Sequence, residues 1–213
     1  MKRLLVLFIA AALLTTPLSA EILIFASGET ERGASRIAIF DGHPRGLTTD
    51  QSEFVGQVTI HFGKPQWKPE YEMKKPENGV WRLGADYWTT LENNLPIRLG
   101  GKRLEPGQHF LAARYSDSGW RLLVLDPERV RKVHLDPFVF QAFPERYLKG
   151  SGSALVAEIP LKSSPLEEKA ERLSILLQAH SKTLPAQATL QIRWGGTELS
   201  AEVEAEVAAP ASD

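Results

Sequence analysis

Four residues of one short stretch could form a binding surface: Trp81, Arg82, Asp86 and Trp88. An arginine guanidinium beside a carboxylate, with exposed indole rings next to it, is a surface on which sugars can stack or carboxylates can be held. The alternative is structural: Trp81 packs in the core, and Arg82 pairs with Asp86 because a buried charge needs a partner. The structural alternative is preferred, and the four residues remain the candidate binding site, with no catalytic residue and no metal ligand assigned.

The histidines do not form a metal-binding motif. They are widely spaced, at His43, His61, His109, His134 and His180, so no two of them preform a site on one helix or turn. His61 and His109 fall in expected strands, where a solvent-facing histidine is the favoured interpretation. Scattered histidines and carboxylates could still meet in space, so an extracytoplasmic hydrolase is the alternative to a non-catalytic protein.

The sequence motifs of several common enzyme classes are missing. The sequence has no Gly-x-Ser-x-Gly elbow, no glycine fingerprint for dinucleotides and no phosphate-binding loop. The serines of residues 150–153 lie in a Gly-Ser run with the composition of a linker. A serine nucleophile there would need a histidine and an acid that the sequence does not place. No cofactor is predicted.

Composition removes further classes of function. The chain has 213 residues, and 25 Lys and Arg against 26 Asp and Glu give a net charge of -1, which provides no field to attract nucleic acid. It has no cysteine, so disulfides, thiolate nucleophiles and cysteine-ligated metal centres are excluded. A hydrophobic fraction of 43% is typical of a folded globular protein.

The N-terminus has the pattern of a secretory signal peptide over residues 1–20. Lys2 and Arg3 precede an apolar run that ends at Leu14, and small residues follow at Ser19 and Ala20. The apolar run is shorter than the roughly 20 residues that a helix needs to cross a bilayer. We therefore expect an exported protein, periplasmic or extracellular, with no membrane span after cleavage.

The remaining chain is predicted to be mainly β. Short segments rich in β-branched and aromatic residues alternate with Gly, Pro, Asn and Asp, which favours a single-domain antiparallel β-sandwich, jelly-roll-like, with at most one or two short helices. The expected strands are 22–26 paired with 36–40, then 57–62, and three hairpins: 95–99 with 102–104, 108–115 with 120–125, and 189–194 with 198–207. Expected core-facing positions in the second hairpin are Phe110, Ala112, Leu122 and Val124. The sandwich is assigned to residues 45–207, with an N-terminal extension or hairpin at 21–44 and a disordered tail at 208–213.

Two segments give weaker signals. Residues 126–155 do not show the alternation typical of β-strands and are expected to form a long connection with one short helix or none. In residues 166–180 helix and strand compete. Ser164, Pro165 and Glu167 form a helix-start signal with a capping box, but the residues from Leu173 onward also alternate like a strand.

Several short motifs resemble those of exported bacterial proteins grouped as domain of unknown function 2911. They are Phe62 to Pro65 at a strand end, the Val-Trp-Arg block from Val80 to Thr89, the hairpin Gly100 to Lys102, the turn Glu105 to Gly107, and Trp120. The similarity spans about residues 45–205 and implies a secreted or periplasmic β-rich domain without an established activity. It also implies a strand at 171–179. The sequence departs from the family at Asp86, where Asn is usual, and in the loop 66–78.

The sequence thus predicts an exported, non-catalytic module of the cell envelope that binds a small ligand, a glycan or an envelope protein. Its binding loops would be those around Trp81 to Trp88 and residues 66–78. A hydrolase that uses scattered histidines and carboxylates is the alternative, and a purely structural envelope component is a third possibility.

Overall fold

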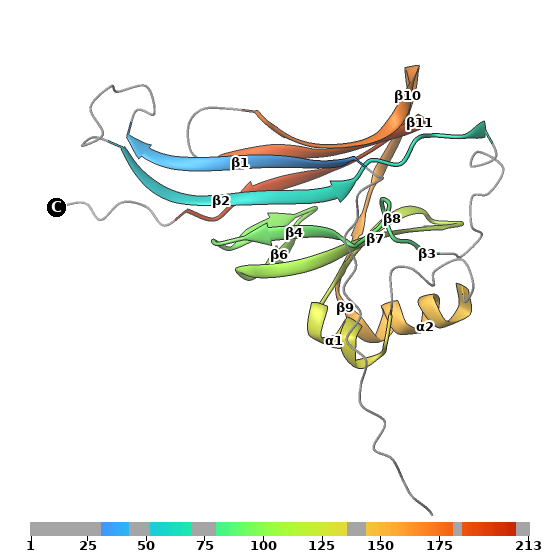
Figure 1. Ribbon diagram of the computed structural model, residues 1–213. Helices are drawn as coiled ribbons and strands as arrows, with labels where there is room; N and C mark the ends of the chain where they lie inside the picture. The colour runs from blue at the N-terminus through green and yellow to red at the C-terminus, as the bar shows by residue number, and fades with distance from the viewer. Residues whose placement is uncertain (1–30, 43–51, 70–79, 136–143, 181–184, 208–213) are drawn as a thin grey trace, which may run out of the picture.

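The computed structural model describes residues 31–42, 52–69, 80–135, 144–180 and 185–207, and these form two antiparallel sheets with two short helices (Figure 1). The larger sheet has the order β1 (Arg32–Gly42), β2 (Ser52–Gly63), β4 (Thr89–Asn93), β7 (Gly107–Ser116), β8 (Gly119–Leu125) and β9 (Leu155–Pro160), and β3 (Val80–Trp81) also pairs with β7. The smaller sheet has the order β10 (Lys162–Ala179), β11 (Ala186–Ala205), β5 (Ile97–Leu99) and β6 (Lys102–Leu104). The predicted β-sandwich is confirmed. Within the described residues, no helix is long and apolar enough to cross a membrane.

The central strands of the larger sheet are buried on both faces. Because side chains alternate along a strand, β7 and β8 send one set toward the smaller sheet and the other toward the helices. The first set is Leu111, Ala113, Leu122 and Val124, and the second is Phe110, Ala112, Leu123 and Leu125. All four predicted core positions of this hairpin are therefore buried, but they divide between two cores.

Helices α1 (Pro127–Lys132) and α2 (Pro144–Ala154) cover the second core. The expectation of one short helix or none in residues 126–155 is wrong. Asp126 caps α1 by accepting a hydrogen bond from the Arg129 backbone nitrogen at 2.8 Å, and Pro127 opens the helix. The Gly-Ser run lies within α2 rather than in a linker, and Ser151 in that run is only 2% exposed.

The segment with conflicting signals is a strand. β10 pairs with β11 from Ser174, opposite Arg193, to Ala179, opposite Ala188. This pairing buries Leu173 and Ile175 in the core between the sheets. The local helix signal fails because the ladder to β11 and this apolar burial outweigh the small preference that capping residues give.

The predicted closing hairpin is wrong. β11 runs without a turn from Ala186 to Ala205, through Gly195 and Gly196. Gly195 has a φ of +58°, and the pairing with β10 shifts register near it, which is the pattern of a bulge. Core-facing residues lie at even positions before the bulge (Leu190) and at odd positions after it (Leu199).

Strand β1 pairs with β2 along its whole length, from Arg32 opposite Gly63 to Gly42 opposite Ser52. Its predicted partner, 22–26, lies outside the described residues, as do the expected signal peptide and C-terminal tail. β1 also contacts β10 (Figure 1), and the Leu177 backbone nitrogen donates to Ser35 Oγ at 2.8 Å. One edge of the sandwich is thereby closed.

Candidate functional site

The two tryptophans of the predicted block lie on opposite faces of the larger sheet. Trp81 stacks on Trp194, with ring centroids 4.8 Å apart and planes 11° from parallel, and it packs against the core between the sheets. Trp88 is only 2% exposed and stacks on Phe110 at 5.3 Å in the helix-covered core. Trp88 is therefore not the exposed indole that the binding interpretation needs, and the half-buried Trp81 packs in the core as the preferred structural alternative expects.

Arg82 and Asp86 belong to a tight loop between β3 and β4. Arg82 Nη1 donates to the main-chain carbonyl of Asp86, and Thr89 Oγ1 donates to the carbonyl of Leu83. Leu83 and Asp86 both have positive φ, +56° and +61°. Asn and Asp tolerate this conformation better than other non-glycine residues, which gives a physical reason for Asn or Asp at position 86. These bonds hold the shape of the loop.

The loop that leaves β2 lies against this block. A Cβ on Gly63 would meet the Ala85 backbone, with its nitrogen and carbonyl carbon at 3.0 Å. Further along, the Trp67 backbone nitrogen donates to the Glu171 carbonyl at 2.6 Å, and the Leu173 nitrogen donates to the Pro65 carbonyl at 3.1 Å. The end of β2 therefore touches the loop between β3 and β4, and the residues that follow β2 run along β10.

An open cleft of about 350 Å³ lies where this loop meets β10, lined by Gln66, Trp67, Pro69, Lys169 and Glu171. Trp67 is half-buried, and the other lining residues are exposed. The Lys169 ammonium lies 4.5 Å from the centroid of the Trp67 ring. The cleft thus combines an aromatic face, a cation, a carboxylate and an amide.

Sequence reasoning found part of this cleft. Residues 66–69 belong to the predicted binding loop 66–78, and the residues from 70 onward in that loop lie outside the described part. Lys169 and Glu171 were missed because only the pairing of the loop with β10 brings them to Trp67. A tryptophan between prolines in a polar loop is the one signal in the sequence that could have singled out Trp67.

Gly195 positions the aromatic side of the cleft. The Trp67 indole fills the space that a Cβ on Gly195 would need, with Cε2 at 3.0 Å. We expect Gly195→Ala to lower the free energy of unfolding by about 1–2 kcal/mol, because its left-handed backbone disfavours a side chain and the indole must move. Gly101→Ala, at φ +81° with no described atom within 4 Å of the new methyl group, is the control for backbone strain alone. Both are measured by chemical denaturation, with tryptophan emission as the probe. An unchanged emission spectrum in folded Gly195→Ala would contradict the contact.

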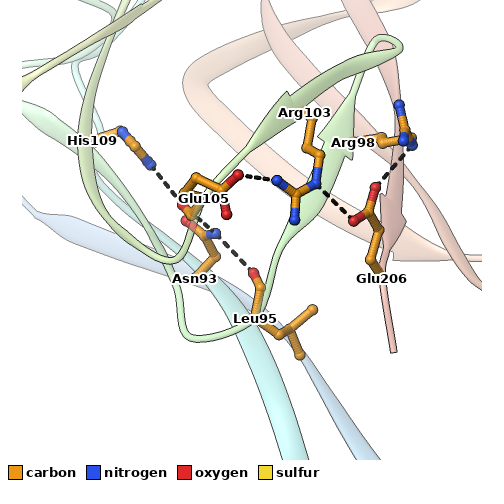
Figure 2. Close-up of polar contacts among 7 residues, drawn as sticks. All are labelled: Asn93, Leu95, Arg98, Arg103, Glu105, His109 and Glu206. Atoms are coloured by element: carbon orange, nitrogen blue, oxygen red, sulfur yellow. Dashed lines mark hydrogen bonds and ion pairs between the residues drawn. The ribbon is translucent and has the colours of Figure 1, made fainter. Parts of the chain in front are cut away.

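A polar cluster holds the β5–β6 hairpin to the end of β11 (Figure 2). Glu206 pairs with Arg98 and Arg103, each at 2.9 Å, and Arg103 also pairs with Glu105. Asn93 Nδ2 donates to the Leu95 carbonyl at 2.9 Å and to the Glu105 carbonyl at 3.0 Å. The hydrogen bond from Arg103 lowers the pKa of Glu206. Every charged group of this cluster has a structural partner.

His109, at the edge of this cluster, gives the protein a pH-dependent stability. Burial lowers the pKa of His109 below its ordinary value of 6.5, outweighing the raising effect of the Asp126 charge. A histidine whose pKa is lower when folded takes up a proton more readily when unfolded, so stability is full above pH 6.5 and falls as the pH drops below it. We expect the Tm to fall as the pH drops below about 6.5, and His109→Gln to reduce that slope. His61 is exposed, so His61→Gln should keep the same dependence of Tm on pH. An equal slope in His109→Gln would contradict this assignment.

The described histidines do not build a catalytic or metal site. His180 Nε2 lies 2.6 Å from Thr189 Oγ1, His109 Nε2 lies 3.4 Å from the Glu105 carbonyl oxygen, and none of the described histidines lines the cleft. Across the described ranges, no group of three or more His, Cys, Asp or Glu could hold a metal ion.

Fold and cleft together define a cysteine-free β-sandwich with one helix-covered face and an aromatic cleft beside its long C-terminal strands. The chain belongs to the family described as a protein of unknown function, DUF2911, which matches residues 46–203. The match includes the strands from β2 to β10 and most of β11, whereas β1 precedes it. No curated protein and no solved structure matches the chain.

Proposed function

We propose that the protein is an exported, non-catalytic binding protein of the cell envelope whose ligand is a glycan held in the Trp67 cleft. The observation that supports this most is the combination of the Trp67 ring with Lys169 and Glu171 in one open cleft. Export, to the periplasm or the medium, is proposed from the signal-peptide pattern of residues 1–20.

The chemistry of the cleft suits a sugar. An indole face is a large apolar platform against which the C–H face of a pyranose can pack. Lys169 can donate hydrogen bonds, Glu171 can accept them, and the Gln66 amide can do both, which matches the hydroxyl and amide groups of a glycan. A volume of about 350 Å³ is at the small end of ligand sites, so the site fits one or two sugar rings.

Lys169 must leave the ring before a sugar can stack on it. A cation–π contact at an exposed site is worth about 0.5–1 kcal/mol, and Lys169 is exposed while Trp67 is half-buried. Breaking the cation–π contact therefore costs little, and the ammonium can then bond a ligand hydroxyl.

The hydrolase alternative has less support at this site. A glycosidase needs two carboxyl groups flanking the bond that it cleaves, and the described residues that line the cleft include one, Glu171.

The test is calorimetric titration of the protein with cell-wall saccharides and common oligosaccharides. We expect a binding sugar whose Kd rises at least about tenfold, equivalent to about 1.4 kcal/mol, in Trp67→Ala. Phe54→Ala, an exposed aromatic on β2, is the matched control and should bind normally. Equal affinity of Trp67→Ala, or no binding by any saccharide, would refute the proposal. Release of a reducing end during titration would support the hydrolase instead.

A further inference from the structure

Two arginines lie directly opposite each other on the outer face of the larger sheet. Arg114 of β7 is the cross-strand partner of Arg121 of β8, and directly paired residues project from the same face. Two residues further along β8, Leu123 lies in the helix-covered core. Val80, the partner of Arg114 on the other side, lies in the same core, so the arginine pair sits on the helix-covered face, at the edge of this core. Both side chains are half-buried.

The charges at this place do not balance. Arg114 Nη2 donates to Glu158 of β9, and among the described residues no side-chain partner is found for Arg121. Like charges placed directly opposite each other destabilise a sheet. Among the described side chains, the two arginines and Glu158 leave one formal positive charge uncompensated.

The hydrogen bonds do not balance either. Arg114 Nε is buried and has no acceptor within the described part of the chain, although a buried N–H without a partner costs about 1–3 kcal/mol. Native proteins keep such groups rarely, and an ion that occupies the site is one of the usual reasons. The arginine pair therefore lacks a second negative charge and an acceptor for Arg114 Nε.

We propose that Arg114 and Arg121 bind a small oxyanion of the phosphate or carboxylate class between their guanidinium groups. A guanidinium presents its N–H donors in a planar fork that matches two oxygens of such an anion. Glu158 holds one arm of Arg114 and so fixes the orientation of that fork. The anion supplies the missing charge and accepts hydrogen bonds from the guanidinium N–H groups that face solvent, and the site is separate from the Trp67 cleft.

The test compares the Tm of the protein in chloride, inorganic phosphate and acetate at one ionic strength. Phosphate or acetate should raise the Tm, by several degrees at about 100 times its Kd, and the stronger of the two identifies the class of anion. Arg121→Gln should lose this rise, and in chloride its Tm should equal or exceed that of the wild type because the repulsion is removed. Arg36→Gln, an exposed arginine of β1 in the same sheet, should keep the rise.

Two results would contradict the proposed oxyanion site. A wild type that responds no differently to the three anions, or an Arg121→Gln protein that keeps the full response, overturns the proposal. If Arg121→Gln folds poorly, Arg121→Lys keeps the charge without the fork and should still show a weaker response. Trp67→Ala should respond like the wild type, which separates this site from the glycan site.

Discussion

Replacing Trp88 by alanine is expected to lower the free energy of unfolding by about 3–5 kcal/mol, the range found for truncating a buried tryptophan or phenylalanine. Trp88 is 2% exposed and stacks on Phe110 in the core beneath α1 and α2. That core is the smaller of the two, so a cavity there removes a large share of the contacts that hold the helices to the sheet. The free energy of unfolding of a small domain is about 5–15 kcal/mol. The Tm should therefore fall by many degrees.

The neighbouring residue provides the control for Trp88. Tyr87 is 51% exposed and meets Phe110 only edge-on, at 6.1 Å. Tyr87→Ala should therefore cost under about 1 kcal/mol. Both changes are measured by urea denaturation followed by far-ultraviolet circular dichroism. A Trp88→Ala protein as stable as Tyr87→Ala would show that the helices do not depend on this indole, and would restore Trp88 as a ligand-binding candidate.

Gly63→Ala should have the next largest effect. We expect it to lower the free energy of unfolding by about 3 kcal/mol, the upper end for overpacking. The Ala85 backbone occupies the space that the new methyl group would need. A flexible side chain could move aside, but this backbone is held by the bond from Arg82 to the Asp86 carbonyl. The expected result is a lower Tm and displacement of the loop between β3 and β4.

Gly152→Ala is the control for Gly63. Gly152 lies in α2, and a methyl group there would have no described atom outside its own helix backbone within 4 Å. Alanine in a helix is more stable than glycine by about 0.5–1 kcal/mol, so this variant should be slightly stabilised. If Gly63→Ala also left the stability unchanged or higher, the end of β2 and the loop between β3 and β4 would not be in contact in solution. The pair of variants therefore tests a contact between two motifs of the family, Phe62 to Pro65 and Val80 to Thr89.

The sequence by itself determined the mainly β class and two of the three predicted hairpins. The Gly100–Gly101 turn joins β5 and β6 as predicted, and the strands on either side of residues 116–119 form β7 and β8. These features can be predicted from the sequence because a tight turn depends on residues next to each other in the chain, such as glycines that accept positive φ. The alternation of Val58, Ile60 and Phe62 likewise identifies the core face of β2 without knowledge of its partners.

The tertiary structure decided where each aromatic side chain faces and which loops meet. Nothing local distinguishes Trp81 from Trp88, since their placement depends on pairing with β7 and on helices that arrive about 50 residues later. The same holds for the strand at 162–179, for the bulge at Gly195, and for Lys169 and Glu171 beside Trp67. Each results from burial or pairing between distant segments, whose free energy exceeds local preference.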